Sequence, residues 1–282
     1  CELEFISLQT LKNRFMKQLK LMVLALTLLM GTMFTSCMDS GENGPQQWAG
    51  VVKVNDRMGY VTFTDAAGTE LIPTNTVPVT LSARMAYIYC QVDEGQDLST
   101  NPKQIKVTLL ADATGIDAPA VTTTAVGGSG DVTTNAPIGS LSFASGYSTV
   151  APFQFSENTI VLPVLYRVKN VTTPEDVKNE LAKHSFTLVC YTDDITSGAT
   201  ELKLHLRYAV NDETTAIVER ATRTSSFKAY DITEFLREYK QKSGQDKPAK
   251  IIVVAQQNEY NNKIEDSSTT EKAYEIEYKT AK

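Results

Sequence analysis

Hydrophobic and polar residues alternate with a period of two along much of the chain after residue 47. Successive side chains of a β-strand point to opposite faces, so this pattern predicts strands with one buried face. The first runs of this kind lie at residues 48–54, 59–65, 69–75, 83–94 and 103–113. Five short strands separated by polar turns predict a small closed or partly closed barrel of the OB type over residues 48–113.

A second group of alternating runs follows in the C-terminal half. These runs cover residues 138–143, 158–168, 185–193, 201–210, 225–232, 249–257 and 272–279. Seven short strands bounded by turn residues predict an Ig-like β-sandwich over residues 138–282. Residues 114–137 between the two groups are rich in Thr, Gly and Ala and poor in large apolar side chains, which predicts a linker. Within this linker, residues 120–126 could add a strand to either neighbour.

Two short helices are predicted within the second group. Thr173 is a favourable N-cap and Pro174 suits the first helical position, so one helix is expected to run from there to Lys183. Residues 231–240 carry apolar side chains at helical spacing and precede Gly244, a residue typical of helix ends. The predicted fold class is therefore all-β, with a small N-terminal OB-like barrel followed by a C-terminal Ig-like β-sandwich with one or two short helices.

The stretch from Met16 to Cys37 has a different pattern. Lys17 and Lys20 precede an uncharged, mostly apolar run at residues 21–34, and two small residues then lead to Cys37. This order is typical of a secretory signal, and the apolar run is shorter than the roughly 20 residues of a spanning helix. The cysteine after the small pair indicates a bacterial lipoprotein signal, in which Cys37 becomes the first mature residue and carries the lipid. A buried helix or a true transmembrane anchor is the alternative interpretation.

The signal divides the N-terminal region. Residues 1–15 precede its Met and are expected to be an upstream extension that the mature protein lacks, and residues 16–36 are expected to be cleaved. Residues 37–47 are polar and contain Gly and Pro, which predicts a flexible tether.

The residues just after the lipid cysteine bear on localisation. Asp39 and Glu42 resemble the short acidic export tags of surface lipoproteins in some Gram-negative bacteria. Met38, rather than Asp, follows the cysteine, so the inner-membrane retention signal is absent. We therefore expect an outer-membrane lipoprotein, with surface exposure as one option.

The overall charge narrows the range of partners. The chain has 27 Lys and Arg against 33 Asp and Glu, a net charge of −6, and residues 1–36 hold four of these bases and two of these acids. The mature chain is therefore more acidic still, and it has no basic cluster. This composition argues against nucleic acid as a partner and against electrostatic adhesion to anionic lipid.

Two cysteines remain once Cys1 is removed and Cys37 is lipidated. Cys90 and Cys190 each lie inside an apolar alternating run, in different predicted domains. Export permits a disulfide, but two buried strand thiols are the expected arrangement.

Familiar catalytic and metal-binding patterns are not found in the sequence. Of the two histidines, His205 lies within a strand pattern, and His184 follows a predicted helix and could cap its C-terminus. G-x-S-x-G, H-E-x-x-H and paired C-x-x-C motifs are absent, so we predict no catalytic, cofactor-binding or metal-binding residues. Residues 193–198 resemble a fragment of a calcium loop, but a hairpin turn fits them better.

Two sites remain open alternatives. A glycan platform would use exposed aromatic side chains, and the available residues are Tyr60, Tyr87, Tyr89, Tyr147, Phe153, Phe155 and Tyr166. Aromatic residues in strands more often belong to the core. A hydrolase would use carboxylates in a cleft between the domains, for which Asp65, Glu94 and Asp212 are candidates.

Several segments resemble the NigD-like lipoproteins of Bacteroidetes. They are GYVTFTD at 59–65, GTELIP at 68–73, RMAYIY at 84–89 and ELKLHLRY at 201–208. The order of signal, OB-like domain and β-sandwich is also similar over nearly all of residues 37–282. These segments are packing and turn signatures, so the resemblance assigns no binding residues.

The resemblance and the missing catalytic motifs together imply a lipid-anchored envelope protein that acts by binding and is not an enzyme. The family is linked to bacteriocin immunity or production through gene neighbourhood. The expected partners are the membrane, through the lipid on Cys37, and an unknown protein or glycan.

Overall fold

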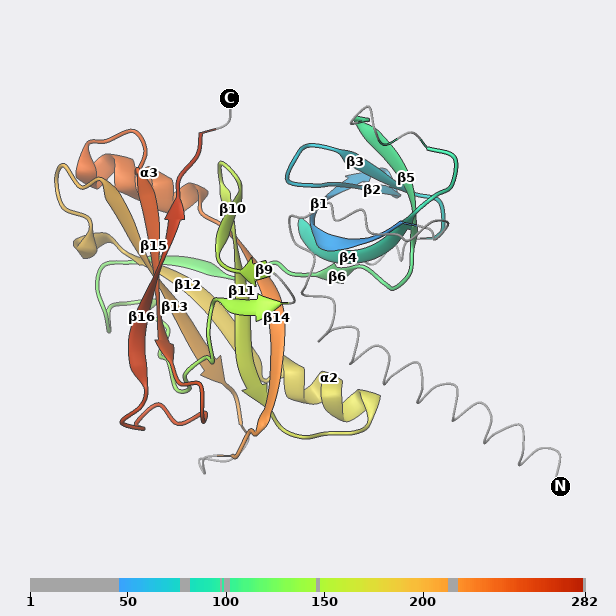
Figure 1. Ribbon diagram of the computed structural model, residues 1–282. Helices are drawn as coiled ribbons and strands as arrows, with labels where there is room; N and C mark the ends of the chain where they lie inside the picture. The colour runs from blue at the N-terminus through green and yellow to red at the C-terminus, as the bar shows by residue number, and fades with distance from the viewer. Residues whose placement is uncertain are drawn as a thin grey trace, which may run out of the picture.

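The computed structural model describes residues 46–76, 82–96, 98, 102–145, 148–212 and 218–280 (Figure 1). Cys37 and its signal lie outside these residues, as do most of the tether and Tyr147. The described chain forms a β-barrel and a two-sheet β-sandwich, with two α-helices in the sandwich part. The predicted all-β fold class is thus confirmed. Among the described helices, none is long and apolar enough to cross a membrane.

The barrel is built from strands with the pairing order of an OB-fold. They are β1 (Gln47–Arg57), β2 (Tyr60–Thr64), β3 (Glu70–Pro73), β4 (Met85–Val92) and β5 (Gln104–Leu109). The order is β1-β2-β3-β5-β4, and β4 pairs back onto β1 to close the barrel. The pair β3–β5 is parallel and the others are antiparallel.

The two faces of β4 have different partners. Ala86, Ile88 and Cys90 point into the barrel core, where they are at most 1% exposed. Met85 and Tyr87, on the opposite face, pack in a second apolar cluster that also contains residues of the sandwich. Strand β4 therefore contributes to the barrel core and to the contact between the domains.

The sandwich consists of a three-stranded and a five-stranded sheet. The first has the order β10 (Phe153–Ser156), β11 (Thr159–Val168) and β14 (Thr222–Asp231), with β14 at its edge. The second has the order β16 (Thr270–Glu277), β15 (Lys250–Gln257), β13 (Glu201–Val210), β12 (His184–Tyr191) and β7 (Ala120–Thr123). Its β13–β15 and β12–β7 pairs are parallel.

The first part of the region between the two groups of strands, residues 114–123, contains two short strands. Strand β6 (Thr114–Gly115) pairs with β4 of the barrel, and β7, within the segment 120–126, joins the sandwich beside β12. The chain thus passes from one domain to the other between these two short strands.

The strand predicted at residues 138–143 is wrong. Ile138 makes one bridge to Gln257 at the end of β15, and Ser140 makes one to Leu165 in β11. These bridges belong to opposite sheets, so the segment crosses between the sheets and cannot run along either. A short hairpin, β8 (Phe143–Ser145) with β9 (Ser148–Val150), follows, and the sequence patterns did not predict it or β10.

Both predicted helices are present. Helix α2 spans Pro174–Ala182, and the Thr173 side chain accepts a hydrogen bond from the Asp176 N–H, as expected of an N-cap. Helix α3 spans Thr233–Ser243 and ends at Gly244, which adopts a left-handed conformation with φ of 76°.

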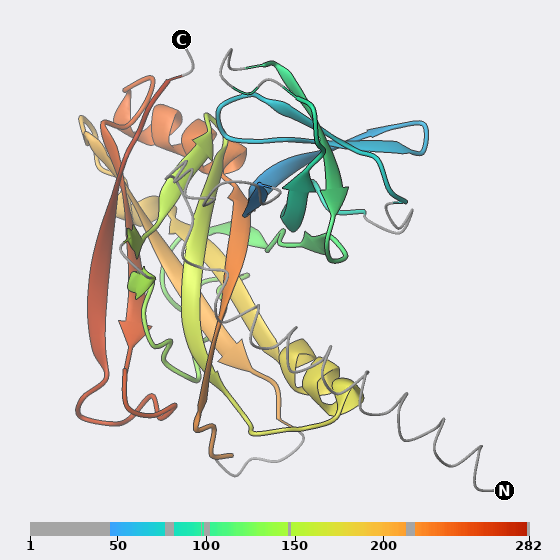
Figure 2. The same ribbon diagram turned by 45° about the vertical axis from the view of Figure 1, so that its right-hand side comes forward.

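The barrel packs against the outer face of the three-stranded sheet. Barrel residues Val51 and Met85 form one apolar cluster with Val161, Phe227 and Ala229 of the sandwich. The Tyr87 and Phe227 rings stack with centroids 5.3 Å apart. At the margin of this contact, Arg84 pairs with Asp231 at 2.6 Å. Figure 2 shows the barrel beside β11 and β14, with α2 on the same side of the sandwich.

Candidate functional site

A cavity of about 200 Å³ lies where the barrel, α2 and the edge of β14 meet. Tyr87 lines it from the barrel, Leu181 from α2, and Phe186 and Phe227 from the sandwich. Ligand sites in proteins are typically apolar hollows at domain junctions with a few polar groups. The cavity fits this description, because most of its wall surface is apolar and a few polar groups are set into it.

The backbone of β14 leaves an open edge at the cavity. Ala229 donates its N–H to the Ile116 carbonyl at 2.8 Å, and its carbonyl accepts the Ala118 N–H at 2.9 Å. Just before this point, Thr114 and Gly115 pair with β4 instead of continuing along β14. Among the described strands, none therefore pairs with this edge of β14 at the residues that precede Ala229.

The edge positions follow from the strand register. Phe227 lies opposite Pro163 of β11, which has no N–H, so this is a non-hydrogen-bonded pair of the antiparallel ladder. Backbone groups two residues apart face the same edge, so the N–H and C=O groups of Ser225 and Phe227 face away from β11, as those of Ala229 do. Ser225 and Phe227 both line the cavity.

Lys228 is the only Lys or Arg among the described residues that line the cavity. Its Nζ lies 5.1 Å from the centre of the Phe186 ring, a cation–π arrangement. Burial lowers the pKa of the Lys228 amine. Within the described residues, no carboxylate forms an ion pair with this amine, and no Asp or Glu lines the cavity.

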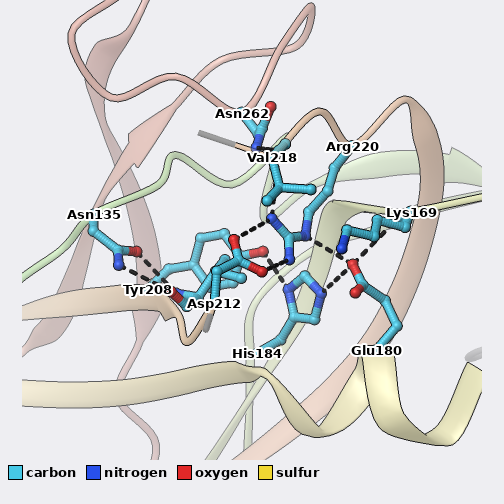
Figure 3. A network of polar contacts seen from close by, with 10 residues as sticks. Asn135, Lys169, Glu180, His184, Tyr208, Asp212, Val218, Arg220 and Asn262 are labelled. Atoms are coloured by element: carbon cyan, nitrogen blue, oxygen red, sulfur yellow. Dashed lines mark hydrogen bonds and ion pairs between the residues drawn. The ribbon is translucent and has the colours of Figure 1, made fainter. Parts of the chain in front are cut away.

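His184 joins the cavity wall to a buried polar network (Figure 3). Its Nδ1 lies 2.6 Å from the Tyr208 hydroxyl, and its Nε2 lies 3.4 Å from Glu180 Oε1. Burial lowers the pKa of His184 to about 4, against the opposing effect of the Glu180 charge. The ring is therefore neutral at pH 7. Because a carboxylate only accepts, Nε2 carries the proton and Nδ1 accepts from Tyr208.

Arg220 is the centre of this network. Its Nε donates to Glu180 at 2.7 Å, and its two terminal nitrogens donate to both oxygens of Asp212 at 2.9 and 2.7 Å. Burial alone would raise the pKa of Glu180, but hydrogen bonds from the Lys169 N–H and Arg220, with the Arg220 charge, hold that pKa below its usual value. The network fixes α2 against β12 and so fixes the wall of the cavity that carries Leu181 and His184.

The sequence suggested a helix-capping role for His184 and a packed or solvent-side position for His205. The residue that caps α2 is Lys183, and the described bonds of the His184 ring go to side chains. His205 is buried, packs edge-on against Tyr191 and bonds Asp194 through Nε2 at 3.1 Å.

The three carboxylates considered for a hydrolase do not come together. Asp65 accepts the N–H groups of Ala67 and Thr69 in the β2–β3 turn, and Glu94 lies in the turn after β4. Asp212 lies in the buried polar network of the sandwich, where it is bound to Arg220. None of the three lines the cavity at the domain junction.

Most of the aromatic residues considered for a glycan platform are packed. Tyr166 is 4% exposed in the sandwich core, and Phe153 and Phe155 pack beside the cluster between the domains. Tyr87 stacks on Phe227, and Tyr89 is half-buried and donates to Gln47. Tyr60 is 55% exposed. Within the described chain these residues therefore do not form a shared exposed platform.

The segment at residues 193–198 and the two cysteines have structural positions away from the cavity. Residues 193–198 connect β12 to β13, and Asp193 and Asp194 pair with Lys242 and Lys203. Cys90 and Cys190 are free and buried in different cores, and burial raises the pKa of each thiol to about 12.

Sequence reasoning missed the residues that make the cavity and its network. Glu180 and Arg220 are 40 positions apart, and neither belongs to a recognisable motif. The one available signal was Lys228 at an inward position of a predicted strand, where a charged residue is unusual.

Comparison with solved structures identifies a relative of high similarity. It is a protein from Bacteroides fragilis described as a "putative lipoprotein", with 81% sequence identity and a TM-score of 0.79. The match covers 84% of this chain and 100% of that chain. The chain belongs to the family of this Bacteroides fragilis protein.

A more distant structure shares the fold alone. It is a protein of unknown function, DUF1344, from Bacteroides vulgatus, with 12% identity and a TM-score of 0.51 over 83% of this chain and 92% of that chain. No family model matches the chain, and no curated protein matches it. The resemblance to NigD-like lipoproteins therefore stays a prediction.

The buried neutral His184 predicts a loss of stability in weak acid. Its pKa is about 4 in the folded protein and about 6.5 when unfolded, so the unfolded chain binds more protons between these values. Lowering the pH from 7 to 5 should therefore reduce the free energy of unfolding by about 2 kcal/mol through this residue. His184→Gln keeps a donor and an acceptor but cannot titrate. Between pH 7 and pH 5 the free energy of unfolding of this variant should therefore fall by about 2 kcal/mol less than that of the wild type.

Urea unfolding of both proteins at pH 7 and pH 5 measures this difference. The other titrating groups, including His205, are common to both proteins and cancel in the comparison. An identical pH dependence in the two proteins would contradict the assignment.

Proposed function

We propose that this chain is a lipid-anchored envelope protein that binds a small molecule in the cavity between its two domains. The observation that carries the proposal is the cavity of about 200 Å³ at the domain junction. It is lined by aromatic side chains, one lysine and an open strand edge. Binding, without catalysis, is the activity that such a wall supports.

The proposed lipid anchor rests on the sequence of residues 16–37 and on the Bacteroides fragilis relative. Residues 16–36 have the order of a lipoprotein signal and Cys37 follows two small residues, so Cys37 is proposed to carry the lipid. The lipoprotein description of the Bacteroides fragilis relative agrees with this reading. The acidic residues after Cys37 support an outer-membrane location with surface exposure.

The NigD-like resemblance would place the protein in systems of bacteriocin immunity or production. That link rests on the quoted sequence segments. A ligand-binding lipoprotein fits such a system, since an immunity factor acts by recognising a molecule outside the cell. A glycan or protein partner on the exposed surface is the alternative partner class.

Filling the cavity should abolish ligand binding. Thr224 lines the cavity, so Thr224→Trp should occupy it, whereas Thr222→Trp changes an exposed position of the same strand and serves as the control. A thermal-shift screen of a small-molecule library against residues 38–282 measures the effect. This fragment retains every described strand and helix.

The wild-type fragment and Thr222→Trp should share hits that raise the melting temperature, and Thr224→Trp should lose them. Hits that stabilise all three proteins equally, or an absence of hits in the wild type, would contradict the proposal. Circular dichroism spectra of the variants control for folding.

Replacing the lipidated cysteine should release the protein from the membrane. Cys37→Ala removes the thiol that would carry the lipid, and Met38→Ala leaves it in place. In cell fractionation with labelled fatty acid, the wild type and Met38→Ala should be labelled and sediment with membranes, and Cys37→Ala should do neither. Membrane-bound, labelled Cys37→Ala would exclude this anchor. Protease treatment of intact cells then tests surface exposure.

A further inference from the structure

The charge of the cavity wall restricts what can bind there. Lys228 is the only Lys or Arg among the described residues that line the cavity, and His184, elsewhere in the same lining, is neutral at pH 7. The network's carboxylate on α2, Glu180, is bound by Arg220 at 2.7 Å. Arg220 thus binds both Asp212 and Glu180, and no carboxylate of the described residues pairs with the amine of Lys228.

A half-buried ammonium without a carboxylate partner is costly, because burial removes water from the charge. The Phe186 ring offsets part of this cost through the cation–π contact at 5.1 Å. An anion in the cavity would offset the rest. The wall is therefore complementary to one negative charge.

The open edge of β14 adds hydrogen-bond donors. The N–H groups of Ser225 and Phe227 face away from β11, and both residues line the cavity. Their carbonyl groups lie on the same edge and can accept from water. Backbone N–H groups beside a lysine are suited to the oxygens of a carboxylate.

The size of the cavity limits the apolar part of the ligand. Its volume is about 200 Å³, and an apolar cavity of about 150 Å³ accommodates benzene. The Tyr87 and Phe227 rings, stacked 5.3 Å apart, belong to the aromatic part of the wall together with Phe186 and Tyr166. A ligand with one ring and a short chain matches this space.

We propose that the cavity binds a small hydrophobic carboxylate, with its apolar body against Tyr87, Phe186 and Phe227 and its carboxylate on Lys228. This inference rests on the proposed function, since it assigns a ligand class to the same cavity. A cavity of this kind should bind the carboxylate more tightly than an uncharged molecule of the same shape.

A matched pair of probes tests the ligand class. 3-Phenylpropionate carries the carboxylate, and 3-phenylpropionamide has the same size and shape without the charge. Isothermal titration calorimetry of residues 38–282 should show that the carboxylate binds more tightly than the amide. The preference should be roughly 10- to 100-fold, as expected for a charge-assisted hydrogen bond.

Variants of Lys228 test whether its charge causes the preference for the carboxylate over the amide. Lys228→Met keeps the apolar stem, so it should bind both probes with the affinity of the amide. Lys228→Arg should retain the preference for the carboxylate. Lys272→Met, at an exposed position of β16, is the matched control and should behave as wild type.

The outcomes separate the two proposals. Equal binding of both probes, removed by Thr224→Trp, would overturn the carboxylate assignment and keep the cavity as the site. Binding of neither probe, with no hit in the library screen, would overturn both. Tighter binding of a capped, uncharged valine-rich pentapeptide than of 3-phenylpropionate would identify the β14 edge as a peptide site and overturn the small-molecule ligand.

Discussion

The packing of β4 against β14 is the contact on which the other features of this molecule depend. Met85 and Tyr87 project from the barrel face that does not line its core, and they meet Phe227 and Ala229. Burying a large apolar side chain contributes roughly 1.5–3 kcal/mol. The cluster therefore joins the two domains, and the cavity begins where this cluster ends along β14.

Buried ion pairs hold the opposite wall of the cavity in place. Arg220 binds Glu180 of α2 and Asp212 after β13, and Glu180 in turn faces His184. Breaking a buried pair by removing one partner leaves an uncompensated charge and costs about 3–5 kcal/mol. This network keeps α2 close to β12, while the apolar cluster keeps the barrel close to β14. Two kinds of interaction thus keep the cavity open from two sides.

The sequence predicts the local structure well. The alternation in residues 83–94 predicts β4, and Thr173 and Gly244 mark helix ends through side-chain capping and backbone conformation. Each of these features depends on neighbours in the chain. The failure at residues 138–143 has a tertiary cause, because an alternating segment can cross between two sheets instead of joining one.

The candidate site was less predictable for the same reason. Tyr87 and Phe227 belong to different domains, so their stacking leaves no trace in a local pattern. Arg220 finds its partners across the fold, and the open edge of β14 exists only because Thr114 and Gly115 pair elsewhere. Lys228 is visible in the sequence, but only the structure shows that none of the described carboxylates pairs with it.

The central claim is that a ligand binds at the junction of the barrel, α2 and the β14 edge. Amide chemical-shift mapping of residues 38–282 during titration with 3-phenylpropionate tests it most directly. The account predicts that the largest shifts occur at the N–H groups of Ser225 and Phe227 and of residues 114–116. Shifts confined to other parts of the barrel or sandwich, or no shifts at a saturating probe concentration, would contradict it.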